Sequence, residues 1–351
     1  MEVKFGYQLP PYNVELIKWA AQYADSSGYS YVFMADHLVG IGIRRFDFLE
    51  AWSTLGALSA ITERVKLGTC VSDPHRRHPA VLAQSLATLD QLTGGRAILG
   101  LGAGEAMNLE PYGIEWSKPV SRLREAALVV RRLLTEDRVS FTGRFYRLRD
   151  AMLEPKGVQK PNPPIWIAAN SPRSIRIAAE LGDGWVPTTP PASPERYRSW
   201  LSELREHASR AGRSPSEVEP ALFLYSLVAP TREEAWEAIR VPAKLIIALW
   251  PGAAKEAGAE IPESLGIHRF TFTTENVEKL LKVALEKIPD EAVDRYFIYG
   301  SPSDCIEKIG EYAKAGVRSF IVALLVRLKD MKAQLKLYTE RVVKPVLGGV
   351  V

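Results

Sequence analysis

The chain has 351 residues, of which 46% are hydrophobic, so it is long enough to bury either one large core or two average ones. Its formal net charge is only +4 and its basic residues are interleaved with acidic ones, a pattern that does not indicate nucleic-acid binding. The two cysteines, Cys70 and Cys305, lie far apart without metal-ligand spacing, and therefore predict neither a disulfide framework nor a metal site. The apolar runs have the length of strands and no charged-then-apolar leader is present, so we expect a cytoplasmic protein without membrane contact.

Strand-sized apolar runs alternate with amphipathic helical segments along the whole chain. Strands are predicted near residues 3–8, 31–35, 66–71, 96–101, 164–168, 184–187, 220–228 and 319–325, and helices near 14–27, 48–61, 80–92, 121–134, 174–181, 194–211, 232–249, 304–315 and 331–343. This alternation favours an α/β fold with a single (β/α)8 TIM barrel over residues 1–351, rather than a doubly wound sheet. Two insertions are expected. One is residues 137–163 after the fourth strand, with a hairpin signal at 141–146, and the other is residues 251–299 between the seventh and eighth strands.

Two of the predicted strands end in polar groups. The second strand is followed by Asp36 and His37, and the fourth by a Gly-Ala-Gly run and Glu105. Strand C-termini converge on one face of a barrel, so these groups are expected to share a cleft. His37 is a candidate proton acceptor, with a packing or capping role as the alternative. For Glu105 the alternative to a role in the site is a first-turn residue that complements a helix dipole. For Asp36 the alternative is the N-cap of a following turn.

The glycine run does not match a nucleotide-binding loop. Gly102 and Gly104 permit close approach of a ligand to the backbone. Glu105, however, stands where the dinucleotide fingerprint requires glycine, and its charge would oppose a pyrophosphate. A basic segment, Pro74–His78 together with Arg44 and Arg45, has two interpretations: it attracts an anionic ligand, or it is a solvated loop.

Five motifs in order give the chain a family resemblance: Asp36-His37, Leu67–Val71, Pro79–Gln84, Gly102–Asn108 and Trp166–Pro172. With them the chain resembles the luciferase-like flavin/deazaflavin oxidoreductases, and within these the coenzyme F420-dependent dehydrogenases of secondary alcohols or glucose 6-phosphate. The resemblance implies hydride transfer between F420 and a small-molecule secondary alcohol, or a related carbonyl or sugar substrate, in a homodimer. Three alternatives stay open: an FMN-dependent luciferase-type monooxygenase, an F420-dependent methylene-tetrahydromethanopterin reductase, and a cofactor-binding barrel without catalysis.

The resemblance also implies roles for individual residues. His37 would take the hydroxyl proton, and Glu105 would supply or stabilise the proton on the deazaflavin ring. The residues implied in cofactor binding are Asp36, Cys70, Val71, Gly102, Ala103, Gly104, Glu105, Asn108, Ala169, Asn170 and Ser171. Among these, Cys70 and Val71 stand where relatives carry a bulge with a non-prolyl cis peptide behind the ring. Asn170 and Ser171 precede a helix start that would bind the phosphate-bearing tail.

The substrate side departs from the resembled dehydrogenases. Ile41 stands where many relatives carry a tryptophan, so a different substrate wall is expected. Only Arg295 falls near the cations that sugar-phosphate members use, and Lys244 and Lys255 are unaligned candidates, which disfavours glucose 6-phosphate. Trp250 and Phe270 suggest a more apolar substrate, with ordinary core packing as the alternative.

Overall fold

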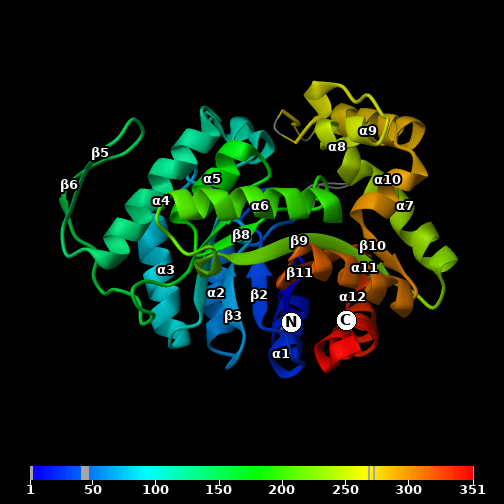
Figure 1. Ribbon diagram of the computed structural model, residues 1–351, viewed down its shortest axis with the longest axis horizontal. Coiled ribbons are helices and arrows are strands. Elements are labelled where there is room, and N and C mark those ends of the chain that lie inside the picture. The colour runs from blue at the N-terminus through cyan, green and yellow to red at the C-terminus, as the bar shows by residue number, and fades with distance from the viewer. Residues whose placement is uncertain (1–2, 41–46, 268, 272, 351) are drawn as a thin grey trace.

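The computed structural model describes residues 3–40, 47–267, 269–271 and 273–350, and its centre is a closed parallel barrel (Figure 1). The barrel strands are β1 (Lys4–Gln8), β2 (Tyr31–Met34), β3 (Lys66–Thr69), β4 (Ala97–Leu101), β7 (Ile165–Ala168), β8 (Gly184–Val186), β9 (Glu219–Val228) and β11 (Ser319–Leu324). Each pairs in parallel with the next, and β11 pairs with β1 through registers such as Gly6 with Ile321, which closes the ring. The predicted (β/α)8 barrel is confirmed.

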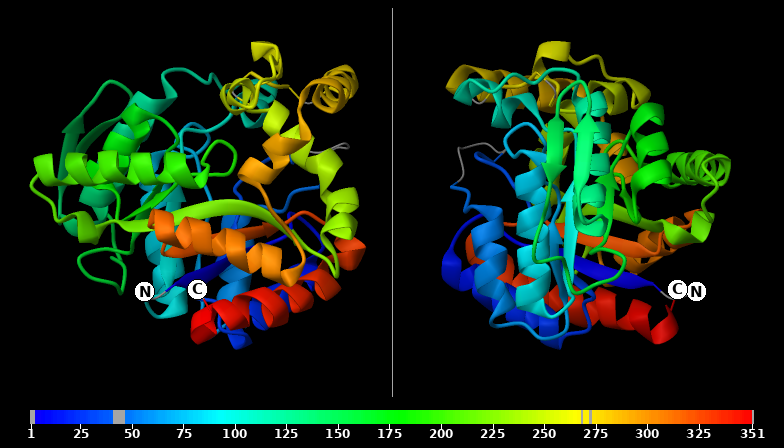
Figure 2. Two further views of the ribbon diagram at one scale, coloured as in Figure 1. Left: turned by 45° about the vertical axis from the view of Figure 1, so that its right-hand side comes forward. Right: turned by 90° about the vertical axis from the view of Figure 1, so that its left-hand side faces the viewer.

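Helices cover the outside of this barrel (Figure 2). They are α1 (Val14–Ser26), α2 (Ala51–Ser59), α3 (Pro79–Thr93), α4 (Pro119–Thr135), α5 (Pro172–Leu181), α6 (Pro194–Arg210), α7 (Arg232–Ala248), α11 (Pro302–Ala315) and α12 (Met331–Tyr338). Ser171, Ser193 and Ser301 cap α5, α6 and α11, each followed by a proline in the first turn, which is a strong local start signal. The last predicted helix does not stay regular to residue 343, because α12 continues as π-helical turns at Thr339–Val343 and Val346–Val350.

The interior of the barrel is filled by large side chains. Tyr31, Phe33 and Trp166 point inward, and the Trp166 ring lies 5.1 Å from that of Tyr31 and 5.6 Å from that of Phe33. The alternate residues Val32 and Met34 face the helices and belong to the main hydrophobic core. Because the middle of the barrel is packed, a ligand has access only at the ends of the strands.

Two insertions flank the barrel at opposite sides (Figure 1). One is the hairpin β5 (Val139–Thr142) and β6 (Arg147–Ala151), which matches the predicted hairpin signal. The other contains α8 (Pro251–Glu256), α9 (Thr274–Lys287) and α10 (Asp290–Tyr296), which form a separate hydrophobic cluster with α7. It ends in a short strand that the sequence pattern did not predict, β10 (Ile298–Gly300), which pairs with the C-terminal end of β9 at residues 226–228.

Short 3-10 turns complete the described structure: Ala106–Asn108, Glu110–Tyr112, Pro215–Glu217, Glu263–Leu265 and Leu328–Asp330. Among the helices in the described ranges, none combines the length and the apolar character that a membrane crossing needs.

Candidate active site

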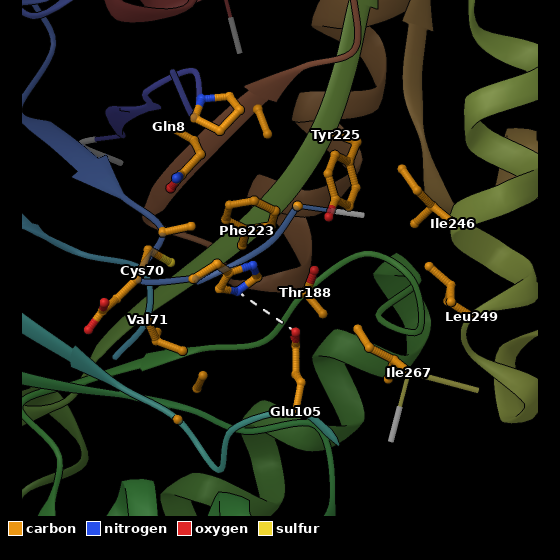
Figure 3. A pocket seen from close by; sticks show the side chains of 18 of the residues that line it. Gln8, Cys70, Val71, Glu105, Thr188, Phe223, Tyr225, Ile246, Leu249 and Ile267 are labelled. Carbon is orange, nitrogen blue, oxygen red and sulfur yellow. Dashed lines mark ion pairs between the residues drawn. The ribbon is translucent and has the colours of Figure 1, made fainter. Parts of the chain in front are cut away.

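A cavity of about 1300 Å³ opens at the C-terminal ends of the barrel strands (Figure 3). Residues that follow β2, β3 and β4 line one side, and residues of β9 and α7, together with Ile267, line the other. Pockets for a single small molecule usually measure roughly 300–1,000 Å³, so this cavity has room for a cofactor and a second ligand.

His37 and Glu105 meet at the centre of this cavity. Nε2 of His37 lies 3.8 Å from Oε2 of Glu105, and each side chain is about a quarter exposed, at 24% and 26%. The ring of Phe48 packs 5.3 Å from the imidazole and supports it from the side. The structure therefore brings together the two residues that the sequence placed at the ends of different strands.

Asn108 connects the segment after His37 to Glu105. Its Oδ1 accepts hydrogen bonds from the backbone N–H groups of Leu38, at 2.8 Å, and Val39, at 3.2 Å. Its Nδ2 donates to Oε2 of Glu105 at 3.3 Å. Asn108 thus holds the His37 loop and the Glu105 carboxylate in fixed relation, whereas its predicted contact with a cofactor ring stays a prediction.

Asp36 is a buried anchor, only 2% exposed. Its carboxylate accepts from Oγ of Ser72 at 2.7 Å and from Nε and Nη2 of Arg77 at 2.8 and 3.1 Å. Burial alone would raise the pKa of Asp36, but the hydrogen bonds and charges of Arg77, Arg76 and Ser72 outweigh it and hold the pKa below its usual value. This carboxylate stays ionised and fixes the backbone that carries His37.

The basic segment Pro74–His78 is neutralised within the protein. Arg76 pairs with Asp73 through Nε and Oδ2 at 2.6 Å, and Arg77 pairs with Asp36 and Glu50. Both arginines are held by carboxylates, so they are neither part of a solvated loop nor free to attract an anionic ligand. Arg44 and Arg45 lie outside the described residues.

The floor of the cavity is built from Cys70, Val71 and the glycine run. The Cys70–Val71 peptide bond is cis, as the family resemblance implied. Burial raises the pKa of the Cys70 thiol to about 12, so it is neutral and not a nucleophile. A Cβ on Gly102 would lie 2.5 Å from Cγ2 of Val71, and Gly104 has a φ of 77°, so both positions require glycine. With Ala103 these residues line the cavity.

The segment before α5 reaches the cavity in part. Asn170 and Ser171 line it, but Ala169 is buried behind them and its carbonyl accepts from Nε1 of Trp185 at 2.9 Å. Oδ1 of Asn170 accepts from the backbone N–H of Thr188 at 3.0 Å.

The predicted substrate residues have different outcomes. Arg295 is exposed on α10, where its Nη1 donates to the carbonyl of Glu256 at 3.1 Å, and it does not line the cavity, so its position does not support a substrate contact. Trp250 lines the cavity, whereas Phe270 is buried in the cluster of the insertion. Ile41 lies outside the described residues.

Among the lining residues that the sequence analysis did not single out, Gln8 and Tyr225 carry polar groups into the site. Oε1 of Gln8 is buried in the cavity without a hydrogen-bond partner among the described residues. Tyr225 points into the cavity toward the carboxylate of Glu105 (Figure 3), and burial, then the charge of Glu105, raise its pKa, which keeps the phenol protonated. The period-two spacing of Phe223, Tyr225 and Leu227, which all line the cavity, is the signal that would have identified the β9 residue.

In the described part of the chain, no group of three or more His, Cys, Asp or Glu side chains is placed to hold a metal ion.

Comparison with known proteins places the chain in a family. The chain is 28% identical over 320 residues to 5,10-methylenetetrahydromethanopterin reductase of Archaeoglobus fulgidus, a match that covers 91% of this chain and 92% of the relative. It is 34% identical over 281 residues to phthiodiolone/phenolphthiodiolone dimycocerosates ketoreductase of Mycobacterium tuberculosis H37Rv, covering 78% of this chain and 73% of the relative. A solved F420-dependent secondary alcohol dehydrogenase with an F420-acetone adduct superposes with a TM-score of 0.79 at 24% identity, covering 98% of this chain and 99% of that one, which shows the shared fold. The luciferase-like monooxygenase family model matches residues 8–319, and the chain belongs to this family.

Proposed function

We propose that the protein is a coenzyme F420-dependent oxidoreductase that transfers a hydride between a secondary alcohol, or the corresponding ketone, and the deazaflavin. The observation that carries this proposal is the His37–Glu105 pair, 3.8 Å apart and facing a cavity large enough for two ligands. A relative named as a ketoreductase and one named as a methylenetetrahydromethanopterin reductase support it.

The residues at the floor fit a flat ring. Gly102 and Gly104, which follow β4, place no side chain on the floor, and Oε1 of Gln8, which has no hydrogen-bond partner among the described residues, offers an acceptor for a ring N–H group. Asn170 and Ser171 stand at the start of α5, where the cofactor's anionic tail would lie. When bound, the deazaflavin would accept or donate the hydride.

The chain itself supplies the proton chemistry. As the C–H hydride of the alcohol leaves, His37 takes the hydroxyl proton and the carbon–oxygen bond becomes a carbonyl. The resulting imidazolium is stabilised by the Glu105 carboxylate, 3.8 Å away. Two opposite charges at this separation attract each other by about 1 kcal/mol in bulk water and by about 4 kcal/mol near a protein surface. In ketone reduction the same groups act in reverse, with His37 as the proton donor.

The first test is a parallel titration of the apo-protein with F420 and with FMN, followed by turnover of a secondary alcohol by the wild type and His37→Asn. We expect selective F420 binding, unchanged affinity in the variant, and a loss of turnover of roughly 10²- to 10⁴-fold, the usual contribution of a general base. Preferential FMN binding with oxygen consumption would overturn the proposal in favour of a monooxygenase.

A second candidate is reduction of methylenetetrahydromethanopterin with the same coenzyme. It is favoured by the relative from Archaeoglobus fulgidus, because that match covers more than nine-tenths of both chains. F420-dependent turnover of this pterin, without turnover of any alcohol or ketone, would establish the second candidate.

A further inference from the structure

The side of the cavity opposite the glycine floor has a different chemistry. It is formed by one face of α7 with the residues after it and one residue of the insertion. We define this α7 wall as Pro242, Leu245, Ile246, Leu249, Trp250 and Ile267. We infer that the α7 wall holds the apolar body of an uncharged, elongated ketone or secondary alcohol, whose oxygen points toward His37. This inference rests on the proposed function, since it names the substrate class of the same site.

The position of the wall supports this assignment. In Figure 3, Cys70 and Val71 lie on one side of Glu105, and Ile246, Leu249 and Ile267 lie on the other. A ring on the floor and a substrate against the wall would therefore meet at the His37–Glu105 pair. Tyr225 lies between the two sides and adds a phenolic hydroxyl close to the reacting oxygen.

The wall is rigid because its residues also pack into the protein. Leu245, Leu249 and Ile267 are 7%, 2% and 7% exposed and belong to the cluster that joins α7 to the insertion. The insertion between β9 and β11 thus completes the site, because it supplies Ile267 and packs against α7 from behind. A preformed apolar surface binds apolar ligands without ordering its own side chains first.

The charges near the wall argue against an anionic substrate. None of its six residues is charged, and the nearby Lys244 pairs with Asp290 at 2.5 Å instead of facing the cavity. Arg327 lines the cavity on its β11 side, 76% exposed, and pairs with Asp330 through Nε and Oδ2 at 2.9 Å. A phosphate or carboxylate held on this wall would lose its hydration without gaining a cation among the described residues.

The test is a series of 2-ketones from 2-butanone to 2-undecanone with reduced F420, together with glucose 6-phosphate and oxidised F420. We expect kcat/KM to rise about 3- to 4-fold for each added methylene until the wall is covered, which follows from the transfer free energy of a methylene group. Glucose 6-phosphate should not turn over. A kcat/KM that is independent of chain length, or efficient turnover of the sugar phosphate, would overturn the inference.

Two variants on the same helix localise the effect. Ile246→Asn places an amide on the wall and should lower kcat/KM for 2-undecanone by at least about 10-fold, while 2-butanone changes by less than about 2-fold. Val241→Asn is the matched control, because Val241 is also partly buried on α7 but does not line the cavity. Equal losses in both variants for both ketones would indicate a general disturbance of α7 and contradict the assignment.

A binding measurement separates this inference from the proposed function. 2-Undecanone added to the apo-protein should quench tryptophan fluorescence, and the quenching should be weaker in Trp250→Phe because Trp250 lines the wall, while Trp116 elsewhere in the cavity still reports binding. Failure of F420 to bind would overturn the proposed function. Ketone binding that persists unchanged in both Ile246→Asn and Trp250→Phe would overturn the α7 wall.

Discussion

Asp36 and His37 are neighbours in the sequence but have different environments in the fold. Asp36 is enclosed by Arg77, Arg76 and Ser72, whereas His37 faces the cavity beside Glu105. The strand pattern predicted that both residues stand at the rim of the barrel. It could not predict which one is buried, because the arginines come from a loop some 40 positions away whose path depends on the folded chain.

Asp36→Asn should destabilise the protein in a pH-dependent manner. The pKa of Asp36 in the folded protein is held below its value in the unfolded chain. The carboxylate therefore adds to the free energy of unfolding at pH values above the unfolded pKa, and this stabilisation is lost as the pH falls through the folded pKa. Removing one partner of a buried ion pair costs about 3 kcal/mol in the free energy of unfolding. Chemical unfolding at pH 7 and at pH 3 should show this difference shrinking at the lower pH.

Glu50→Gln is the control for that measurement. Glu50 also pairs with Arg77, but its side chain is 45% exposed, so the loss should be smaller. A difference between wild type and Asp36→Asn that is the same at both pH values would show that the carboxylate charge contributes nothing.

Tyr225→Phe should weaken substrate turnover without changing F420 affinity. The phenol is kept protonated by its raised pKa and points into the cavity, so its O–H group is available to donate a hydrogen bond to a substrate oxygen. Loss of one such bond should reduce kcat/KM by up to about 10-fold. Tyr299→Phe is the matched control, because burial also raises the pKa of Tyr299 but its hydroxyl bonds to Asp294 outside the main cavity. Equal effects of both variants would rule out a specific role for Tyr225.

At the scale of elements, the β5–β6 hairpin was predicted from a local sequence signal but is stabilised by a residue of another element. The signal around Gly143 predicted the turn, but the group that stabilises it is Glu125 on α4. Its carboxylate accepts from the backbone N–H groups of Arg144 at 2.8 Å, and of Phe145 and Tyr146 at 2.9 and 3.3 Å. Periodicity within α4 cannot identify a contact that joins two elements.

Glu125→Ala should loosen this hairpin, because three backbone donors lose their acceptor. Hydrogen bonds to a charged group contribute about 1.5–3 kcal/mol each, and water can replace part of this at the partly exposed turn. Limited proteolysis should then cut near residues 143–146 faster in the variant than in the wild type. Glu125→Gln retains one acceptor oxygen and should be cut at an intermediate rate, whereas indistinguishable rates for all three proteins would contradict the assignment.

At the scale of the whole molecule, the barrel and the place of the insertion were predictable, but the internal structure of the insertion was not. The barrel repeats one unit, a buried strand followed by an amphipathic helix, so its pattern recurs along the chain. The segment 251–299 has no repeat, and its helices are positioned by their packing against α7. That packing decides which residues, such as Ile267, reach the cavity and which, such as Phe270, remain in the core.

The hydrophobic core of the barrel and the hydrophobic cluster of the insertion should open independently in amide hydrogen exchange. Of the 14 residues of α9 only Leu280 and Ala284 are buried, whereas every residue of β2 and β4 is buried within the barrel. Local opening requires less free energy where few apolar contacts are lost, so the amides of α9 should exchange well before those of β2 and β4. The α7 wall connects the cavity to the cluster of the insertion, since its residues face the cavity and pack on the insertion. A long-chain ketone should therefore slow exchange in α7 and, through it, in α9, while the rates in β2 stay the same. Identical rates in α9 and β2 without ligand would instead show a single cooperative unit, in which the insertion is as stable as the barrel that it completes.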